Sequence, residues 1–414
     1  MYSAWKQVIG DPLMPKEWPK RVRIGINGFN EIARLIIRCS LEDKRGLDVV
    51  AINVTDMTTE QIIYMIQYDT LLGQFKGCLS KCVSFHLAKE NSNESVDYCT
   101  IEIAGRILCI FQYEDISCIP WDCVNVEYVI ETTGKFTQLD EVSKHLTRGR
   151  ASKVLVIGDN LNLPLLMYPI SCRGYQRGTS IVSSGSAASH AVATLVALID
   201  AAIPIEECMA TIMLPVDDKM NLVDNNVPYG NDWRKGRSAY LSIIPGRCHS
   251  TIQSVIQALP NMKNRIDGIT LNIPIMEGGL VDLACRLNGS IENIEELVEK
   301  IKNSHLLKSF TSLHKSCQPF KREIKVGLNE ETIHEYYNLN ENDLTTIAKF
   351  LPEEDAFVSS DASKKSTLCL FDIDCCSKLQ DDNTVRVVSW FDLNMSFSQR
   401  ILDTIVFMRN VDHS

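Results

Sequence analysis

The sequence predicts an α/β fold in two parts. A doubly wound, mostly parallel sheet with helices on both faces comes first, and an α+β part with a mostly antiparallel sheet follows. Short apolar strands alternate with helical segments in the first half of the 414 residues, which is typical of parallel sheets. From about residue 206 long alternating runs of apolar and polar residues follow, and these are typical of antiparallel strands.

The regular structure is expected to begin with a βαβ unit. Residues 22–37 predict a short strand, a glycine-marked turn and an amphipathic helix, and Leu47–Asn53 predict a second apolar strand. This unit has about the length that dinucleotide-binding (Rossmann-type) folds use. Further apolar strands are expected at 107–112, 126–131 and 153–157, and the alternation over 101–112 predicts an exposed hairpin strand.

Strands dominate the second half. Residues 292–303 predict a helix between two of them. Residues 305–357 are charged and irregular, so we expect an insertion there, with a helical piece near 341–350. The strands are expected at Ala210–Pro215, Ile266–Pro274, Gly279–Leu287 and Thr384–Phe391.

Charge and composition exclude several classes of function. The net charge of −10, from 52 acidic and 42 basic residues, disfavours binding to nucleic acid or to anionic membranes. No apolar run has the length of a membrane span, and residues 1–20 lack the apolar core of a signal peptide. The 15 cysteines are scattered without the paired spacing of a zinc site. We therefore expect a cytoplasmic protein with reduced thiols and no metal, nucleic-acid or membrane partner.

Residues 181–190 are the most informative segment. They predict a short apolar strand and a turn of small residues that opens a helix. Such a turn displays one side chain at a helix N-terminus, where backbone N–H groups and the helix dipole stabilise a thiolate or an oxyanion. The displayed residue is Ala187, which cannot act as a nucleophile.

The turn after the first strand is a degenerate glycine-rich motif. Gly28 is present, but Asn30 and Ala33 stand where a full G-x-G-x-x-G has its second and third glycines. Asn30 obstructs the close approach of a pyrophosphate, and Glu31 puts a carboxylate where a phosphate would bind the helix N-terminus. From these residues alone, a plain strand-to-helix turn is the favoured interpretation.

The residue that should bind ribose hydroxyls is also missing. A dinucleotide fold has an acidic residue at the end of its second strand. This chain has Val54 there, and Asp56, which could still reach the ribose, lies two residues further on.

A series of motifs extends from about residue 22 to 414, and it consists of Gly25–Phe29, Val49–Asn53, Gln67–Thr70, Glu131–Thr137, Ile181–Ser186, Trp233–Arg237, Ile243–Pro245, Val281–Leu287, Val358–Asp361 and Ser389–Asp392. This series resembles the glyceraldehyde-3-phosphate dehydrogenase family. The resemblance implies a Rossmann-type NAD-binding domain and an α+β catalytic-type domain with a mostly antiparallel sheet. We divide the chain accordingly into an extension (1–21), a first domain (22–182, completed by a helix at 394–414) and a second domain (183–393, with the insertion at about 305–357).

The resemblance implies that the catalytic pair is lost. The family motif Ser-x-x-Ser-Cys-Thr-Thr-Asn, placed on Ser183–His190, puts the nucleophilic cysteine at Ala187. The family's catalytic histidine falls at Leu214. Removing both a nucleophile and its base ordinarily costs many orders of magnitude in rate.

Two neighbouring arrangements could in principle substitute for that pair. His190 could act as a base for Ser186, although a serine without a matched base is a poor nucleophile. Cys248 and His249 form a Cys-His dipeptide, but adjacent side chains diverge, so we interpret this pair as loop surface.

The substrate and cofactor positions that the resemblance implies have also lost most of the family's binding residues. At the substrate-phosphate positions stand Ser186, Asp217 and Arg237. We expect Arg237 to pair with Asp217 or Asp218, and Leu393 occupies the nicotinamide position. The residues left around the cofactor cleft are Asn27, Gly28, Phe29, Asn30, Glu31, Ile32, Thr132, Thr133 and Gly134.

The sequence therefore favours a pseudoenzyme that acts as a scaffold or oligomer partner, with NAD binding weakened or lost. A homo-tetramer, or a hetero-oligomer with an active relative, is expected because segment 217–245 resembles the family's interface loop. The alternative is an active NAD-dependent glyceraldehyde-3-phosphate dehydrogenase of glycolysis, which needs a nucleophile in the 184–190 turn or at Cys248. A nucleic-acid-binding function on this scaffold is the least favoured, given the acidic charge.

Overall fold

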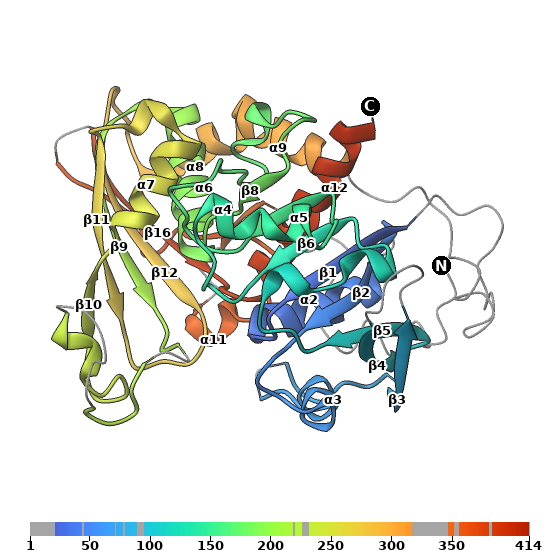
Figure 1. The fold of residues 1–414 in the computed structure, drawn as a ribbon. Coiled ribbons are helices and arrows are strands. Elements are labelled where there is room, and N and C mark those ends of the chain that lie inside the picture. Colours follow the sequence, from blue (N-terminus) through green and yellow to red (C-terminus); the bar gives the residue numbers. More distant parts are fainter. Residues whose placement is uncertain are drawn as a thin grey trace.

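The computed structural model contains two sheets, which lie side by side (Figure 1). Both are eight-stranded. The structure describes residues 21–43, 45–70, 72–77, 79–88, 95–217, 220–225, 232–316, 347–351, 356–380 and 383–413.

The first sheet has the strand order β3-β4-β5-β2-β1-β6-β7-β8. Strands β5, β2, β1, β6, β7 and β8 pair in parallel, and β3-β4-β5 form antiparallel pairs at one edge. This confirms the predicted mostly parallel sheet. The strands are β1 (Val22–Asn27), β2 (Leu47–Asn53), β3 (Leu79–Ala88), β4 (Ser95–Ile103), β5 (Arg106–Phe111), β6 (Tyr128–Glu131), β7 (Lys153–Val156) and β8 (Ile181–Ser183).

The expected hairpin at 101–112 is present, since β4 and β5 pair antiparallel, but the expectation of one exposed strand over the whole segment was wrong. The chain reverses at Ala104 and Gly105, which both have positive φ, so the segment belongs to two strands, β4 and β5. Most of β5 is buried, because it lies between β4 and β2 rather than at the edge of the sheet.

Helices cover the first sheet, and the last helix of the chain is one of them. Side chains of α12, among them Ile401 and Ile405, share a buried core with Leu35 and Ile36 of α2. The C-terminal segment thus packs against the βαβ unit that begins the fold. The helices of this part are α2 (Glu31–Glu42), α3 (Thr59–Gln67), α4 (Leu139–Val142), α5 (Lys144–Thr147) and α12 (Met395–His413), with short 3-10 helices η1 (Ile116–Cys118), η2 (Trp121–Val124) and η3 (Cys172–Gly174).

The second sheet has the order β10-β11-β9-β12-β16-β14-β13, with β15 beside β16. Among the described strands of this sheet, only β11–β9 and β13–β14 pair in parallel, which confirms the mostly antiparallel prediction. The strands are β9 (Ile205–Leu214), β10 (Ile244–Arg247), β11 (Ile266–Asn272), β12 (Gly279–Leu287), β13 (Ala348–Leu351), β14 (Cys369–Asp372), β15 (Ser377–Lys378) and β16 (Thr384–Phe391).

Helices α6 to α9 pack on one face of this sheet and form its buried core with the inward side chains of the strands. On the opposite face, Met209 of β9 and Ile269 of β11 are exposed. Within the described residues, no helix combines the length and apolar character that a bilayer span requires. The helices are α6 (Ala187–Ala202), α7 (His249–Ala258), α8 (Ile294–Asn303), α9 (His305–Ser316) and α11 (Ser359–Ala362), with 3-10 helices η4 (Trp233–Gly236) and η5 (Pro260–Met262).

The flanks of the expected insertion are regular structure. Helix α9 begins at His305, and β13 extends the second sheet with Ala348 and Leu351 buried. The helical piece expected near 341–350 was therefore wrong for 348–350, because parallel pairing with β14 holds that segment extended. Residues 317–346 lie outside the described residues, as do the first 20 residues of the expected extension.

Candidate functional site

The turn between β8 and α6 places Ala187 at the first position of the helix. Gly185 has a φ of +75°, and a Cβ there would lie 2.8 Å from Ser189 Oγ, so the sharp turn requires glycine. Ser186 is the N-cap, and its side chain accepts a hydrogen bond from the Ser189 backbone N–H. The turn therefore presents residue 187 at a helix N-terminus, as the sequence predicts.

Ser186 is held by its neighbours. Its Oγ donates to Asp159 Oδ2 over 2.8 Å, and its backbone N–H donates to Asp159 Oδ1 over 3.0 Å. Ser189 Oγ in turn donates to the carbonyl oxygen of Ser186 over 2.9 Å. These bonds give Ser186 the contacts of a helix cap rather than those of an activated hydroxyl.

His190 does not lie beside Ser186 as a base. Its ring is fully buried, and Nε2 lies 2.7 Å from the carbonyl oxygen of Ser184, to which it donates. Burial lowers the pKa of His190 to about 4. The Phe397 ring packs edge-on against it, with centroids 5.4 Å apart. The Ser186–His190 pair considered from the sequence therefore does not form.

Leu214 ends β9 and is half-buried beside the second core. Asp217, three residues later, is exposed. The expected pairing of Arg237 with Asp217 or Asp218 was wrong in its partner: Arg237 Nε lies 3.2 Å from Asp224, and residue 218 lies outside the described residues. The same Asp224 carboxylate accepts a hydrogen bond from the backbone N–H of Ser238. Asp224 is therefore bound to two consecutive residues, Arg237 and Ser238.

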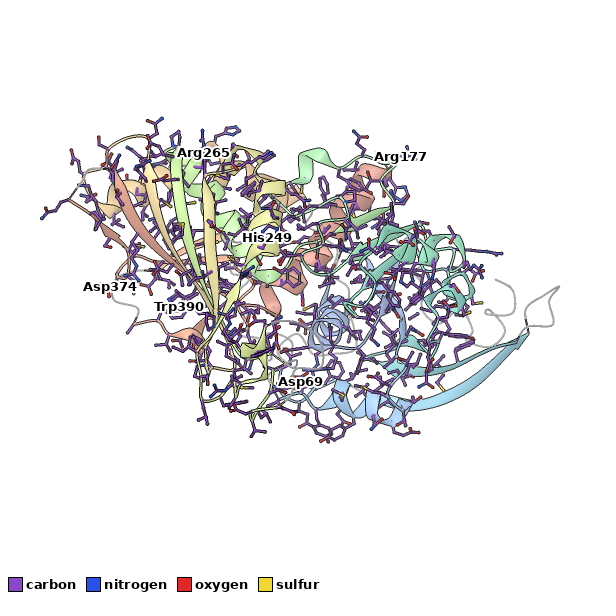
Figure 2. All side chains as sticks on the ribbon, turned by 60° about the vertical axis from the view of Figure 1, so that its left-hand side comes forward. Asp69, Arg177, His249, Arg265, Asp374 and Trp390 are labelled. Carbon is purple, nitrogen blue, oxygen red and sulfur yellow. The ribbon has the colours of Figure 1, made fainter. Side chains whose placement is uncertain are left out.

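The interpretation of Cys248-His249 as loop surface was wrong for the cysteine. His249 begins α7, near the strands of the second sheet (Figure 2), and it is exposed. Cys248 is the residue before the helix and is buried. Burial raises the pKa of the Cys248 thiol, which disfavours the nucleophilic thiolate.

The glycine-marked turn after β1 is closed by side chains. Gly28 has a φ of +104°, and a Cβ there would lie 2.5 Å from Thr132 Oγ1. Asn30 caps α2 by accepting from the Ala33 N–H over 3.0 Å, and its Nδ2 donates to the carbonyl oxygen of Thr132 over 3.0 Å. The Asn30 side chain thus bridges the two turns at the carboxyl ends of β1 and β6.

Glu31 adds a carboxyl group at the same helix end. Its Oε1 accepts from Asn394 Nδ2 over 2.8 Å, which ties the start of α2 to the segment before α12. Burial raises the pKa of Glu31 to about 7, with a further contribution from Asp69 and opposition from Arg34. With this pKa the Glu31 carboxyl group is about half ionised near pH 7, so the negative charge at the N-terminus of α2 grows as the pH rises above that value.

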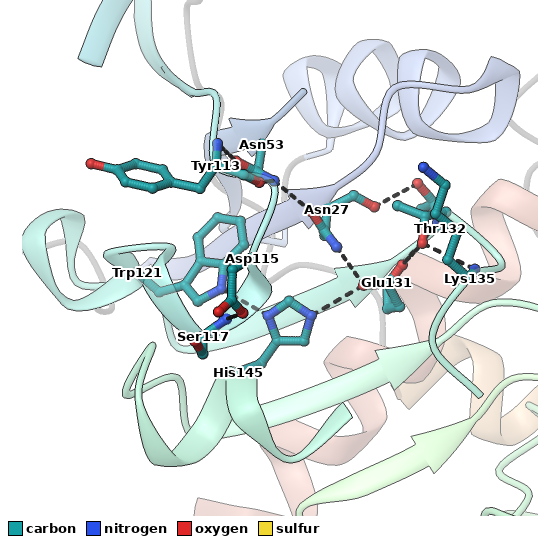
Figure 3. Close-up of polar contacts among 11 residues, drawn as sticks. Asn27, Asn53, Tyr113, Asp115, Ser117, Trp121, Glu131, Thr132, Lys135 and His145 are labelled. Carbon is teal, nitrogen blue, oxygen red and sulfur yellow. Dashed lines mark hydrogen bonds and ion pairs between the residues drawn. The ribbon is translucent and has the colours of Figure 1, made fainter. Parts of the chain in front are cut away.

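Retained residues of the turn belong to a buried polar network (Figure 3). Asn27 Nδ2 donates to Glu131 Oε2 over 2.6 Å, and Asn53 Nδ2 donates to Asn27 Oδ1 over 2.9 Å. His145 Nε2 lies 3.1 Å from Glu131 Oε2, and the Trp121 indole N–H donates to His145 Nδ1 over 3.0 Å. All five side chains are buried, so packing alone accounts for the presence of Asn27.

Leu393 lies at the junction of the second sheet and α12. It lines a cavity of about 20 Å³ together with Leu72, Pro215 and Met276, which is room for about one water molecule. In the part of the chain that the structure describes, no three His, Cys, Asp or Glu side chains are grouped to hold a metal ion.

Comparison with known proteins decides the family. A model described as the glyceraldehyde 3-phosphate dehydrogenase NAD binding domain matches residues 22–139, and one described as the C-terminal domain matches residues 186–393. The chain belongs to the glyceraldehyde-3-phosphate dehydrogenase family. The NAD-binding match assigns NAD to it by family resemblance.

Similar family members cover nearly the whole chain. Glyceraldehyde-3-phosphate dehydrogenase of Schistosoma mansoni is 28% identical over 394 residues, which is 95% of this chain and 99% of the relative. Glyceraldehyde-3-phosphate dehydrogenase 3, cytosolic, of Oryza sativa subsp. japonica is 28% identical over 392 residues, again 95% and 99% of the two chains. The enzyme of Omphalotus olearius is 27% identical over 391 residues, which is 94% of this chain and 98% of the relative.

The dehydrogenase-family turn of this chain fits a dinucleotide poorly. Asn30 spans the gap to Thr132, and Glu31 lies at the helix end where a pyrophosphate would seek positive potential. Gly28 and Thr132 remain as backbone that could approach a nucleotide, with Phe29 buried and Ile32 packed on the first core beneath them. Thr133 donates its backbone N–H to Glu131 over 2.9 Å, and Gly134 turns the chain with a φ of +67°.

Sequence reasoning missed the residues that support these two turns. Asp159 could have been found, because it follows an apolar strand at the sheet edge where the 181–183 strand also ends. The Glu131–His145–Trp121 chain of contacts joins residues up to 24 positions apart, and no spacing rule connects them.

Proposed function

We propose that this member of the glyceraldehyde-3-phosphate dehydrogenase family does not turn over aldehyde and acts as an oligomer partner or scaffold. The observation that carries the proposal is Ala187 at the first position of α6. A methyl group cannot attack an aldehyde, and Leu214 cannot take up a proton. The hydroxyl and imidazole nearest in sequence, Ser186 and His190, are engaged in capping and backbone contacts.

Weak or absent NAD binding is part of this proposal. Three features support it: the Asn30 bridge, the Glu31 carboxyl group and the small cavity beside Leu393. The family resemblance implies that the pyrophosphate of NAD would bind beside Asn30 and Glu31 and the nicotinamide beside Leu393. The first two side chains occupy the pyrophosphate position, and the small cavity leaves little room for the nicotinamide.

Self-association is supported by exposed apolar side chains around segment 217–245. Trp233 is 81% and Leu241 87% exposed, and Ile243 is exposed beside them. Hydrogen bonds join two described parts of this segment: Ser238 Oγ donates to the carbonyl oxygen of Leu222, and the Ala239 N–H donates to that of Asn221. Hydrogen-bonded loop residues that expose large apolar side chains are typical of a protein–protein interface. We propose a homo-tetramer that also accepts an active relative as a subunit. We place it in the cytosol, because two relatives are named as cytosolic enzymes.

A turnover assay tests the proposal. The purified chain is incubated with glyceraldehyde 3-phosphate, NAD and inorganic phosphate, with an active family member as the positive control. We expect no NADH formation above the enzyme-free rate. Ordinary turnover, together with an aldehyde-modified residue in the 184–190 turn or at Cys248, would establish the active-dehydrogenase alternative.

The oligomer is tested by sedimentation velocity. We expect a species of four chains for the wild type and smaller species for Leu241→Asp. Leu139→Asp is the matched control, because Leu139 is 54% exposed on α4, away from the segment. Co-expression with a tagged active relative should give mixed oligomers that lose this chain when Leu241 is changed. A monomeric wild type that joins no relative contradicts the partner function.

A further inference from the structure

Asp159 connects the ends of three elements around the turn that precedes α6. It follows β7 at the sheet edge where β8 also ends, and Gly158 forms an isolated bridge with Gly185. The β7–β8 pairing is parallel, so the carboxyl ends of both strands meet there. This brings the Asp159 side chain to the N-terminus of α6.

Three hydrogen-bond donors converge on the Asp159 carboxylate. The Ser186 N–H donates to Oδ1 over 3.0 Å, the Ser186 hydroxyl to Oδ2 over 2.8 Å, and the Thr251 hydroxyl of α7 to Oδ2 over 3.0 Å. Two of the donors belong to the N-cap of α6, and the third lies in the first turn of α7. Backbone N–H groups and hydroxyls at helix N-termini are the groups that bind a free anion.

The Asp159 carboxylate has no cationic side chain as an ion-pair partner among the described residues. Its charge also acts further along α6, since it opposes the effect of burial on the pKa of His190. The positive end of α6, a helix of 16 residues, is therefore the main partner of the Asp159 charge.

We propose that Asp159 is an internal anion that fills the anion-binding position at the N-terminus of α6. While it is there, neither a thiolate at position 187 nor an inorganic anion is stabilised at this turn. The inference rests on the proposed function and deepens it: the turn is not only without a nucleophile but also electrostatically closed to one. Replacing Ala187 by cysteine alone is then insufficient to rebuild a reactive centre.

The consequence is measurable as the pKa of a thiol placed at position 187. A helix N-terminus lowers a cysteine pKa below its ordinary value of about 8.5, whereas a neighbouring carboxylate raises it by roughly one to three units. In Ala187→Cys, we expect the pKa to be about 8.5 or higher. In Ala187→Cys/Asp159→Asn, which keeps the side-chain shape and removes the charge, we expect it to fall by about one unit or more.

The experiment follows alkylation of the introduced thiol by iodoacetamide against pH, with the modified peptide quantified by mass spectrometry so that the native cysteines do not interfere. The matched control is Ala187→Cys/Asp140→Asn, because Asp140 is an exposed aspartate on α4. It should leave the pKa of the introduced thiol unchanged. Equal pKa values in the Asp159→Asn and Asp159 backgrounds overturn the proposal.

A second measurement covers the case in which the Asp159→Asn protein does not fold. Ala187→Cys by itself then decides: a pKa below the ordinary value of about 8.5 overturns the proposal, and one at or above that value supports it. Neither measurement depends on turnover. Activity of the wild-type chain would refute the proposed function and leave the thiol pKa results standing.

Discussion

The indole N–H of Trp121 donates to Nδ1 of His145 over 3.0 Å, and both side chains are fully buried. Because Nδ1 accepts, the proton of the ring lies on Nε2, which faces Glu131 Oε2 at 3.1 Å. The Glu131 carboxylate also accepts from Asn27 and from Thr133. A buried carboxylate with this many donors is stabilised by them together, so each donor is important for folding.

Replacing His145 should therefore destabilise the fold. In His145→Phe, Glu131 loses one donor and the Trp121 N–H loses its acceptor, and both groups remain buried. We expect a loss of about 2–4 kcal/mol in the free energy of unfolding, measured by urea denaturation. His249→Ala is the control, because His249 is exposed at the start of α7, and we expect a change within about 0.5 kcal/mol. Equal losses in the two variants would contradict the network.

Glu31 should make stability depend on pH. Burial raises its pKa to about 7 in the folded protein from an ordinary value of 4.5, so the folded state holds the proton more tightly than the unfolded state. The stabilisation by the proton is complete below about pH 4.5 and is lost as the pH rises through about 7. Since Glu31 is partly exposed, we expect about 1–3 kcal/mol across this window.

The measurement is urea denaturation of the wild type and Glu31→Gln between pH 5 and pH 8. The amide of the substituted side chain can still accept from Asn394 but does not ionise, so the variant should gain stability relative to the wild type as the pH rises. Asp392, whose pKa is raised to about 6 by burial, acts in the same direction and remains in both proteins. Parallel curves for the two proteins would show that Glu31 does not titrate in this range.

Asp412 should fasten the end of α12. Its carboxylate accepts from Tyr175 Oη over 3.0 Å and from Tyr128 Oη over 3.2 Å, and lies 3.3 Å from Lys153 Nζ. We expect Asp412→Ala to cost about 1–3 kcal/mol in the free energy of unfolding. It should also increase amide hydrogen exchange in the last turns of α12. Asp56→Ala, at an exposed aspartate after β2, should change neither quantity.

Short apolar runs predicted most strands of the first sheet, and the alternation of apolar and polar residues predicted β9, β11, β12 and β16 of the second sheet. Leu47–Asn53 and Gly279–Leu287 form strands with the expected bounds. Leu47–Asn53 is buried throughout and is marked by an apolar run, whereas Gly279–Leu287 is buried at every second residue and is marked by alternation. Segment 348–350 was mistaken for helix because its pairing partner, β14, lies about twenty residues away in the chain. The local pattern of apolar and polar residues does not indicate a pairing partner so distant in the sequence.

The sequence predicted those features of the site that depend on a single residue in a recognisable turn. Ala187 and Asn30 can be read from the turns in which they stand. Asp159 and Thr251, which approach Ser186 from two other elements, could not be placed without the fold. The partner of Arg237 was missed for the same reason: Asp224 lies near it because the backbone N–H of Asn225 donates to Gly236 and that of Ala239 donates to Asn221.

NAD binding gives the sharpest test of the degenerate glycine turn. We expect no heat on calorimetric titration of the wild type with millimolar NAD, because the Asn30 side chain bridges to Thr132 and Glu31 places a carboxyl group at the start of α2. Asn30→Gly/Glu31→Gln opens the bridge and removes the charge. Since glycine is tolerated as an N-cap, α2 should stay folded, and NAD affinity should rise about tenfold or more.

The control is Glu60→Gln, which removes a carboxylate from the first turn of α3, a helix of the same part of the fold. It should leave NAD binding as in the wild type. Binding of NAD to the wild type at micromolar concentration would show that the Asn30 bridge opens on its own. The turn would then still admit the pyrophosphate, and the proposal of weakened NAD binding would be rejected. The loss of the nucleophile at Ala187 would not be affected by that result.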